Sequence, residues 1–125
     1  MIQGIGTDIV SVARMAQFRD RHGERALGRI LAPMEIPECQ ASAHPDRFLA
    51  KRFAAKEALG KALGTGIRAP VLLTAIAIDP DDLGKPDFSY SPELAAWLDE
   101  RHLTVHLSIS DEREYAVAYV IAEQR

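Results

Sequence analysis

RFLAKRFAAKEALGKALGTGIR, residues 47–68, predicts one long helix around which the rest of the chain is arranged. Most of these residues favour helix, and the start signal His44-Pro45-Asp46 precedes them. Gly64-Thr65-Gly66 supplies a plausible stop at the C-terminal end. We therefore expect a long central helix followed by a glycine turn.

The charges of this predicted helix are unevenly distributed. It carries six Lys or Arg residues and a single acid, Glu57. At helical spacing Leu49, Phe53, Glu57 and Gly60 share one stripe, which should be buried. A buried carboxylate is costly unless a cation or metal accompanies it. Two interpretations follow: a metal-binding carboxylate in a basic surround that suits a phosphate-rich ligand, or a solvated surface helix with one chance Glu.

Length and composition limit the class of protein. A chain of 125 residues that is 47% hydrophobic can bury one core, so we expect a single domain spanning residues 1–125. The opening MIQGIGTDIV lacks the features of a signal peptide, and the apolar run 71–78 is too short to cross a bilayer. We expect a cytoplasmic protein without membrane contact. The single cysteine, Cys39, excludes an internal disulfide and favours a small buried side chain.

The distribution of charge says more than the net charge of −3. Residues 11–31 hold five Arg and two acids, whereas residues 79–100 hold seven acids and one cation, Lys85. The molecule should therefore have a basic and an acidic side, and the partners of the basic side should be anionic. No interleaved aromatic residues favour nucleic acid as that partner.

The remaining elements are predicted from periodicity and turn signals. We expect strands over 2–10, 71–78, 87–90, 105–110 and 115–121, and helices over 12–31 (divided or kinked at Gly23), 33–40 and 92–101. The last two strands form a hairpin. The chain is thus predicted to be an α+β protein, a small antiparallel sheet packed with a long central helix and shorter helices.

Asp8 and Glu57 are the candidates for metal binding. Asp8 lies near the end of the first strand, where an Asp is commonly a helix cap or turn former, but Ser11 competes for that role and frees Asp8. Two carboxylates together fit magnesium, which takes one or two of them plus waters and substrate phosphates. The chain has no closely spaced His or Cys set that would favour zinc. The residues alone predict a magnesium and phosphate site, without naming the reaction.

Five motifs, in order and in register, resemble the holo-[acyl-carrier-protein] synthase family, the single-domain 4'-phosphopantetheinyl transferases. They are G-I-G-T-D-I-V at 4–10, R-F-x-A-K-R-F-A-x-K-E-A at 47–58, K-A-x-G-T-G-I at 61–67, G-K-P at 84–86 and H-x-S-I-S-D-E at 106–112. The resemblance implies an enzyme that transfers the 4'-phosphopantetheine arm of coenzyme A to a serine of apo acyl carrier protein and releases adenosine 3',5'-bisphosphate. Two alternatives are a non-catalytic acyl-carrier-binding module of the same fold and a magnesium phosphohydrolase.

The resemblance also assigns roles to residues of the site. Asp8 and Glu57 would hold Mg²⁺ beside the coenzyme A pyrophosphate, and Lys61 would stabilise the leaving oxygen. Either Glu57 itself or a water bound to the metal would take the serine proton. Eight residues would bind coenzyme A, the first three by neutralising phosphates, the fourth by letting the backbone approach, and the last four at the nucleotide end: Arg52, Lys56, Lys61, Gly64, Lys85, Pro86, His106 and Ser108.

Carrier docking and assembly complete what the resemblance implies. The acidic carrier would dock on the first helix, where we expect contacts from Arg14, Met15, Phe18, Arg21 and Arg25. By themselves, the arginines are equally consistent with an ordinary solvated row. The family is usually trimeric, so the resemblance implies a homotrimer whose active sites lie between neighbouring chains.

Overall fold

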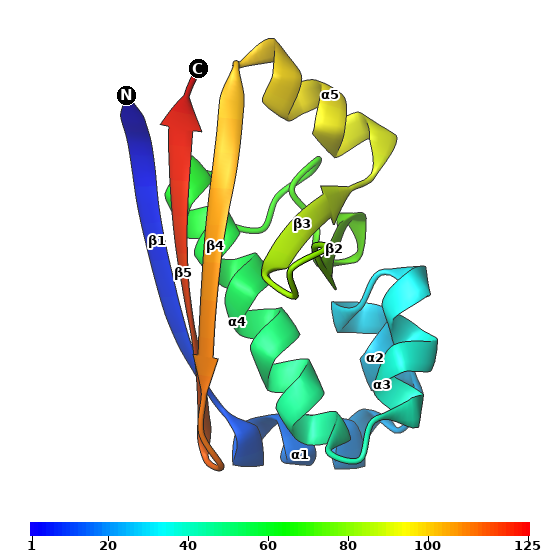
Figure 1. The fold of residues 1–125 in the computed structure, drawn as a ribbon. Coiled ribbons are helices and arrows are strands. Elements are labelled where there is room, and N and C mark those ends of the chain that lie inside the picture. Colours follow the sequence, from blue (N-terminus) through cyan, green and yellow to red (C-terminus); the bar gives the residue numbers. More distant parts are fainter.

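The computed structural model describes all residues, 1–125. Figure 1 shows a three-stranded sheet on one side of the long helix α4 and a two-stranded hairpin with short helices on the other. The elements are β1 (Ile2–Ser11), α1 (Val12–His22), α2 (Arg25–Ile30), η1 (Pro33–Glu35), α3 (Ile36–Ala41), α4 (Pro45–Leu63), η2 (Leu73–Ala75), β2 (Ile76–Pro80), β3 (Pro86–Tyr90), α5 (Pro92–Glu100), β4 (Leu103–Asp111) and β5 (Tyr115–Gln124). The predicted α+β class and central helix are confirmed.

The main sheet is antiparallel and has the order β1-β5-β4. The β4–β5 hairpin was predicted from alternation, and its register pairs Ser108 with Tyr119. The pairing of the first strand with the last brings the two ends of the chain together, since Gln124 N–H donates to the Met1 carbonyl. Strands β2 and β3 form a separate antiparallel pair.

Strand β1 lies unusually close to α4, and two glycines make this possible. A Cβ atom at Gly4 would collide with the carbonyl oxygen of Ala62, and a Cβ at Gly6 with that of Ala58. Only glycine permits such close approach of backbone to backbone. Because of this contact, Asp8, two residues further along β1, faces the same helix.

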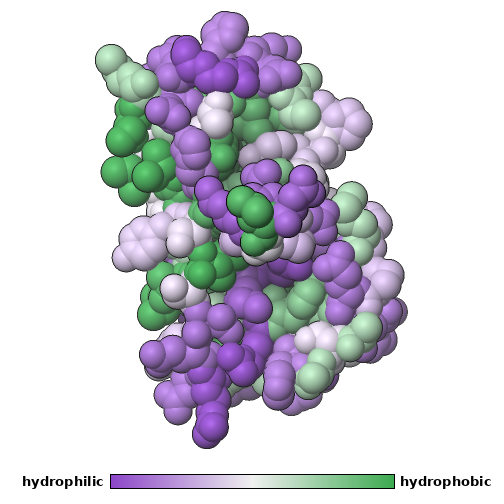
Figure 2. Space-filling view, viewed as in Figure 1, coloured by the Kyte–Doolittle hydropathy of each residue, from purple (hydrophilic) through white to green (hydrophobic).

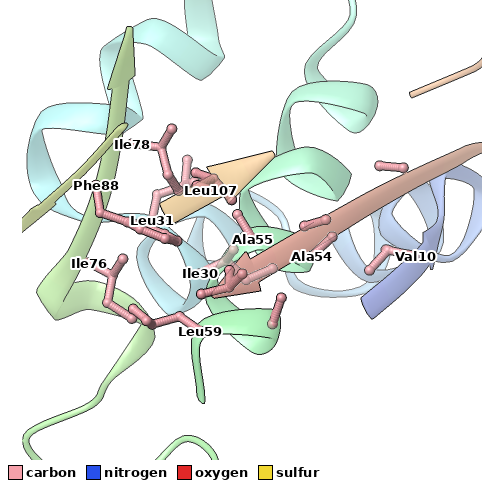
Figure 3. Close-up of a cluster of buried hydrophobic side chains, with 14 of the residues drawn as sticks. Val10, Ile30, Leu31, Ala54, Ala55, Leu59, Ile76, Ile78, Phe88 and Leu107 are labelled. Atoms are coloured by element: carbon pink, nitrogen blue, oxygen red, sulfur yellow. The ribbon is translucent and has the colours of Figure 1, made fainter. Parts of the chain in front are cut away.

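A core cluster of 24 buried residues joins the sheet, α4 and the β2–β3 pair. Figure 3 shows Ala54, Ala55 and Leu59 of α4 between Val10 of β1 and Ile76 of β2. Small side chains on α4 let neighbouring elements pack closely, whereas the larger residues fill the space beyond. The helix thus forms the centre of the molecule. None of the helices of the chain is both long and apolar enough to cross a membrane.

Caps and breaks of the helices agree with the sequence signals. Ser11 caps α1 by accepting a hydrogen bond from Arg14 N–H at 3.3 Å, and Ser91 caps α5 in the same way from Leu94 N–H at 3.2 Å. Gly64 ends α4 in the left-handed conformation, with φ 76°. Gly23, with φ 61°, separates α1 from α2. Asp8 is therefore free of a capping role.

The prediction for residues 71–78 is wrong in part. Only the segment from Ile76 onward is a strand, and Leu73–Ala75 forms a 3₁₀ turn, η2. The carbonyl of Leu73 accepts a hydrogen bond from the Lys56 ammonium at 3.0 Å, so it points to α4 and not to a neighbouring strand. A β-branched run cannot reveal such a distant side-chain contact.

Candidate active site

Asp8 and Lys61 form the first pair of the candidate site. Lys61 Nζ lies 3.1 Å from Asp8 Oδ1 and also donates to the Thr7 carbonyl at 2.9 Å. The Asp8 side chain is 18% exposed, whereas that of Lys61 is 55% exposed and remains open to solvent. The ammonium therefore sits at the mouth of the site, where an anionic ligand can reach it.

Glu57 lies one helical turn before Lys61 on α4 and is half-buried. Burial raises the pKa of Glu57 above its ordinary value, the nearby Asp8 charge raises it further, and Lys61 lowers it. The structure thus brings together the two carboxylates and the lysine that the sequence singled out. The stripe of α4 that was predicted to be buried is confirmed in part: Leu49 is fully buried, with 0% exposure, whereas Glu57 is half-buried.

Asp8 and Glu57 line the same cleft, which has a volume of about 460 Å³. Arg14, Met15 and Phe18 of α1 border it, but Met15, one of the predicted docking residues, is buried, with 8% exposure. Arg21 and Arg25 are exposed but do not line the cleft. The other residues of the lining are Ile9, Val10, Arg29, Ile30, Phe53 and Leu73. Arg29 belongs to the basic row of the sequence and is a further cation at this cleft.

The Asp8–Glu57 pair fits a divalent cation. No group of three or more His, Cys, Asp or Glu residues suited to hold a metal is present in the chain. The repulsion that raises the pKa of Glu57 shows that the two carboxylates share one electrostatic environment. A pair of carboxylates leaves coordination positions for water and phosphate oxygens, which is the arrangement that Mg²⁺ accepts.

The prediction that Lys56 neutralises phosphates is wrong. Its side chain is fully buried, at 0% exposure. Its ammonium donates to Glu35 Oε1 at 2.6 Å, to the Ile30 carbonyl at 2.8 Å and to the Leu73 carbonyl at 3.0 Å. All three N–H donors are therefore used inside the protein, and none is left for a ligand. Burial lowers the pKa of Lys56 to about 8, and Glu35 opposes this shift.

Glu35 is a buried charged residue that the sequence analysis missed. Besides Lys56, it accepts hydrogen bonds from Ala32 N–H at 2.9 Å and Ile78 N–H at 3.0 Å, and Arg52 Nε lies 3.2 Å from Oε2. In the sequence it is an ordinary acid in the first turn of a short helix. Only its partner on a distant helix explains its burial.

The residues predicted to bind coenzyme A do not all lie at one place within the chain. His106 and Ser108 are exposed on β4, whereas Leu107 between them is buried in the core. They therefore face the side of the sheet opposite to Asp8, which faces α4. His106 Nε2 lies 2.9 Å from Glu123 Oε1 on that outer face. Within one chain, these residues cannot join Asp8 and Glu57 around a single ligand.

Arg52 and Pro86 line a second cleft of about 290 Å³, together with Gly84, Ile109 and Asp111 among others. The neighbouring Lys85 is exposed in the turn between β2 and β3. Asp81 fixes that turn, because its carboxylate accepts hydrogen bonds from the backbone N–H groups of residues 83 and 85. This second cleft contains none of the residues of the first.

Gly64 follows the last residue of α4. Its positive φ is explained by its role as the C-cap, where its N–H donates to the Lys61 carbonyl at 3.1 Å. No atom lies within 4 Å of the Cβ that a larger residue would carry there. The backbone on this side is therefore open for a ligand near Lys61.

The chain is similar to known proteins over its full length. The model of the 4'-phosphopantetheinyl transferase superfamily matches residues 4–120. The holo-[acyl-carrier-protein] synthase of Dechloromonas aromatica is 58% identical over 123 residues, covering 98% of both chains. The crystal structure of the Neisseria meningitidis synthase is 50% identical with a TM-score of 0.96, covering 99% of this chain and 100% of that one.

One of the similar solved structures is a complex with CoA (3',5'-ADP). The Bacillus anthracis synthase in complex with CoA (3',5'-ADP) is 38% identical to this chain with a TM-score of 0.83, covering 100% of this chain and 99% of that one. The family match spans most of the residues and includes every motif in the first cleft. The chain therefore belongs to the 4'-phosphopantetheinyl transferase superfamily.

Proposed function

We propose that Asp8, Glu57 and Lys61 form the reaction centre of this transferase. The chain transfers the 4'-phosphopantetheine arm of coenzyme A to a serine of apo acyl carrier protein and releases adenosine 3',5'-bisphosphate. The observation that carries the assignment of the centre is that Asp8 of β1 and Glu57 of α4, far apart in the sequence, line one cleft, and that Lys61 Nζ lies 3.1 Å from Asp8 Oδ1.

The reaction is a phosphoryl transfer, in which positioning and charge neutralisation outweigh covalent catalysis. The serine Oγ forms a bond to the phosphorus that carries pantetheine. The bond from that phosphorus to the bridging oxygen of the diphosphate breaks, and this oxygen leaves with the nucleotide. Glu57, a carboxylate that lines this cleft, accepts the serine proton. Lys61 stabilises the leaving oxygen.

Asp8 and Glu57 would hold Mg²⁺ together with oxygens of the diphosphate. When bound, the ion would neutralise those oxygens and stabilise the developing charge of the leaving group. In the structure, Lys61 Nζ lies 3.1 Å from Asp8 Oδ1. We propose that this lysine moves from the carboxylate to the phosphate when substrate and metal enter, since its side chain is 55% exposed and an ammonium forms strong hydrogen bonds to phosphate oxygens.

The cleft border on α1 is proposed to dock the carrier protein. Arg14 is exposed and lines the cleft, and the half-buried Phe18 supplies apolar surface beside it, with the buried Met15 at the cleft lining. Arg21 and Arg25 extend the positive charge along the same side of the molecule. An acidic carrier helix would be drawn to this surface by charge and held by the apolar contacts.

Reversing the charge of Arg14 should weaken carrier docking selectively. For Arg14→Glu we expect a rise of about tenfold in the KM for apo carrier protein and little change in the KM for coenzyme A, because the two substrates use different surfaces. Steady-state kinetics with each substrate varied in turn checks this. Arg125→Glu, at the exposed C-terminus, is the matched control. Equal changes in both KM values would contradict a separate docking surface.

The outer face of the main sheet is proposed to be an interface between copies of this chain. Figure 2 shows hydrophobic residues gathered along the side formed by β1 and β5. Five large apolar side chains are exposed on this outer face: Ile5 (65%), Ile9 (64%), Tyr115 (49%), Tyr119 (57%) and Ile121 (37%). An exposed apolar patch of this kind favours a protein interface. In a homotrimer, His106 and Ser108 of one chain would complete the site of a neighbour.

Placing a charge in this face should dissociate the assembly. For Tyr119→Asp we expect the sedimentation velocity of a monomer and a large loss of transfer activity, because a buried unpaired carboxylate would oppose association. Met34→Asp changes an exposed apolar residue elsewhere and should leave both properties unchanged. A Tyr119→Asp variant that stays trimeric would exclude this face as the interface, and a fully active monomer would contradict shared sites.

One experiment separates the proposed reaction from its alternatives. The purified chain is incubated with coenzyme A, Mg²⁺ and apo carrier protein, and the carrier is weighed by mass spectrometry. We expect the mass gain of one phosphopantetheine, which disappears when EDTA removes the metal. Binding of the carrier without consumption of coenzyme A would indicate a non-catalytic module. Consumption of coenzyme A without carrier would indicate a phosphohydrolase.

A further inference from the structure

We infer that Lys56, held in place by Glu35, is a positioning residue that fixes one wall of the cleft lined by Asp8, Glu57 and Arg14, which is called the carrier cleft below. The inference rests on the proposed function of that cleft. Lys56 precedes Glu57 on α4, so the two side chains leave the helix about 100° apart. Glu57 lines the cleft, whereas Lys56 does not line it and is fully buried.

The first observation is the choice of partners of the Lys56 ammonium. Two of its three hydrogen bonds go to backbone carbonyls, those of Ile30 at 2.8 Å and Leu73 at 3.0 Å. Both residues line the carrier cleft. They come from separate segments, the end of α2 and the start of η2. One ammonium therefore ties two parts of the wall to the helix that carries Glu57.

The two carbonyls differ in the donors that their own segments supply. Ile30 is the last residue of α2, and the last carbonyls of a helix have no partner within the helix. A cation at that end also interacts favourably with the helix dipole. Leu73 begins a 3₁₀ turn of three residues, and its carbonyl accepts from Ile76 N–H within the turn as well as from Lys56, which is the bond that ties the turn to α4. Without Lys56, both segments would lose a buried contact.

Glu35 holds the ammonium in this position. Its Oε1 accepts from Lys56 at 2.6 Å and from Ala32 N–H, and its Oε2 accepts from Ile78 N–H. The carboxylate thereby links η1 and β2 to the same point. Arg52 extends the cluster to the surface, where Arg52 Nη2 meets Glu38 at 3.3 Å and the side chain lines the second cleft. The charges of the two cations, Lys56 and Arg52, offset those of the two acids, Glu35 and Glu38.

Stability alone does not account for such a pair. Replacing a buried ion pair by neutral side chains of similar volume is often neutral for folding, or even stabilising. Here the pair fixes backbone carbonyls beside a cleft, and a shift of those segments would change the shape that the carrier meets. A positioning role therefore predicts an effect on carrier binding that exceeds any effect on folding.

The test uses the double variant Glu35→Gln/Lys56→Met, which removes both charges together and leaves an amide oxygen for Ala32 N–H. We expect it to fold, and its KM for apo carrier protein to rise about tenfold, with kcat and the KM for coenzyme A within about twofold of the wild type. Hydrogen exchange should be faster at the amides of Leu31 and Ala75, beside the two carbonyls, while the protection of α4 is retained.

Controls keep the inference separate from folding and from the proposed function. Asp99→Asn/Arg125→Gln removes an exposed ion pair and should leave all three kinetic constants unchanged. A folded Glu35→Gln/Lys56→Met protein with wild-type KM values, or with equal losses for both substrates, would overturn the positioning role. If this variant does not fold, Glu35→Gln alone decides, because it keeps the acceptor oxygen and removes the charge that holds the Lys56 ammonium: an unchanged carrier KM in the folded protein overturns the inference. Failure of the wild type to modify any carrier would instead defeat the proposed function.

Discussion

Glu57→Gln is expected to lose nearly all transfer activity, by about a thousandfold in kcat, while the protein stays folded. The amide has the shape of the carboxylate but cannot accept the serine proton, and removal of a general base typically costs 10²- to 10⁴-fold. The variant also removes one of the two carboxylates proposed to hold the metal. The mass of the carrier after single-turnover incubation measures the remaining transfer.

Folding of this variant is verified independently. The unfolding temperature should not fall, because burial and the Asp8 charge oppose the ionised form of Glu57 in the wild type. Glu100→Gln is the matched control, since it makes the same change on an exposed side chain of α5. Substantial transfer by a folded Glu57→Gln protein would refute both the base and the metal assignment.

Gly6→Ala is expected to have the largest effect on stability. The added Cβ would collide with the Ala58 carbonyl, which belongs to the backbone of α4 and cannot turn away as a side chain could. The strand would have to move off the helix, so we expect a loss of about 3 kcal/mol or more in the free energy of unfolding. Urea denaturation followed by circular dichroism measures it.

Gly28→Ala provides the comparison for this glycine. Gly28 lies in α2 with no atom within 4 Å of the added Cβ, so alanine should stabilise the helix by about 0.5–1 kcal/mol. If Gly6→Ala were as stable as the wild type, the close contact between β1 and α4 would not be what sets the position of Asp8.

Local signals in the sequence predicted most of the elements. Helix α4, its glycine cap and the two serine caps depend on neighbouring residues, so they could be recognised without knowledge of the fold. Because the sequence offered Ser11 as the cap of α1, Asp8 was expected to be free of a capping role. Asp8, Glu57 and Lys61 were expected to act together from charge and resemblance; in the structure Asp8 and Glu57 line one cleft and Lys61 lies 3.1 Å from Asp8.

Long-range contacts limited the prediction of the site. Lys56 stands among other cations on α4 and looks the same in sequence as a phosphate-binding lysine. Its burial depends on Glu35, which lies in another segment and has no special motif. Likewise, His106 and Ser108 were expected at the nucleotide end of coenzyme A, but the sequence could not show that His106 faces away from Asp8, because that depends on the order of strands in the sheet.

The shared divalent ion is tested most directly by a crystal structure of the protein with coenzyme A and Mn²⁺, in which anomalous scattering locates the metal. The account predicts one anomalous peak within coordinating distance of the carboxylates of both Asp8 and Glu57 and of the diphosphate. A metal bound to the diphosphate without either carboxylate, or bound elsewhere on the protein, would contradict it.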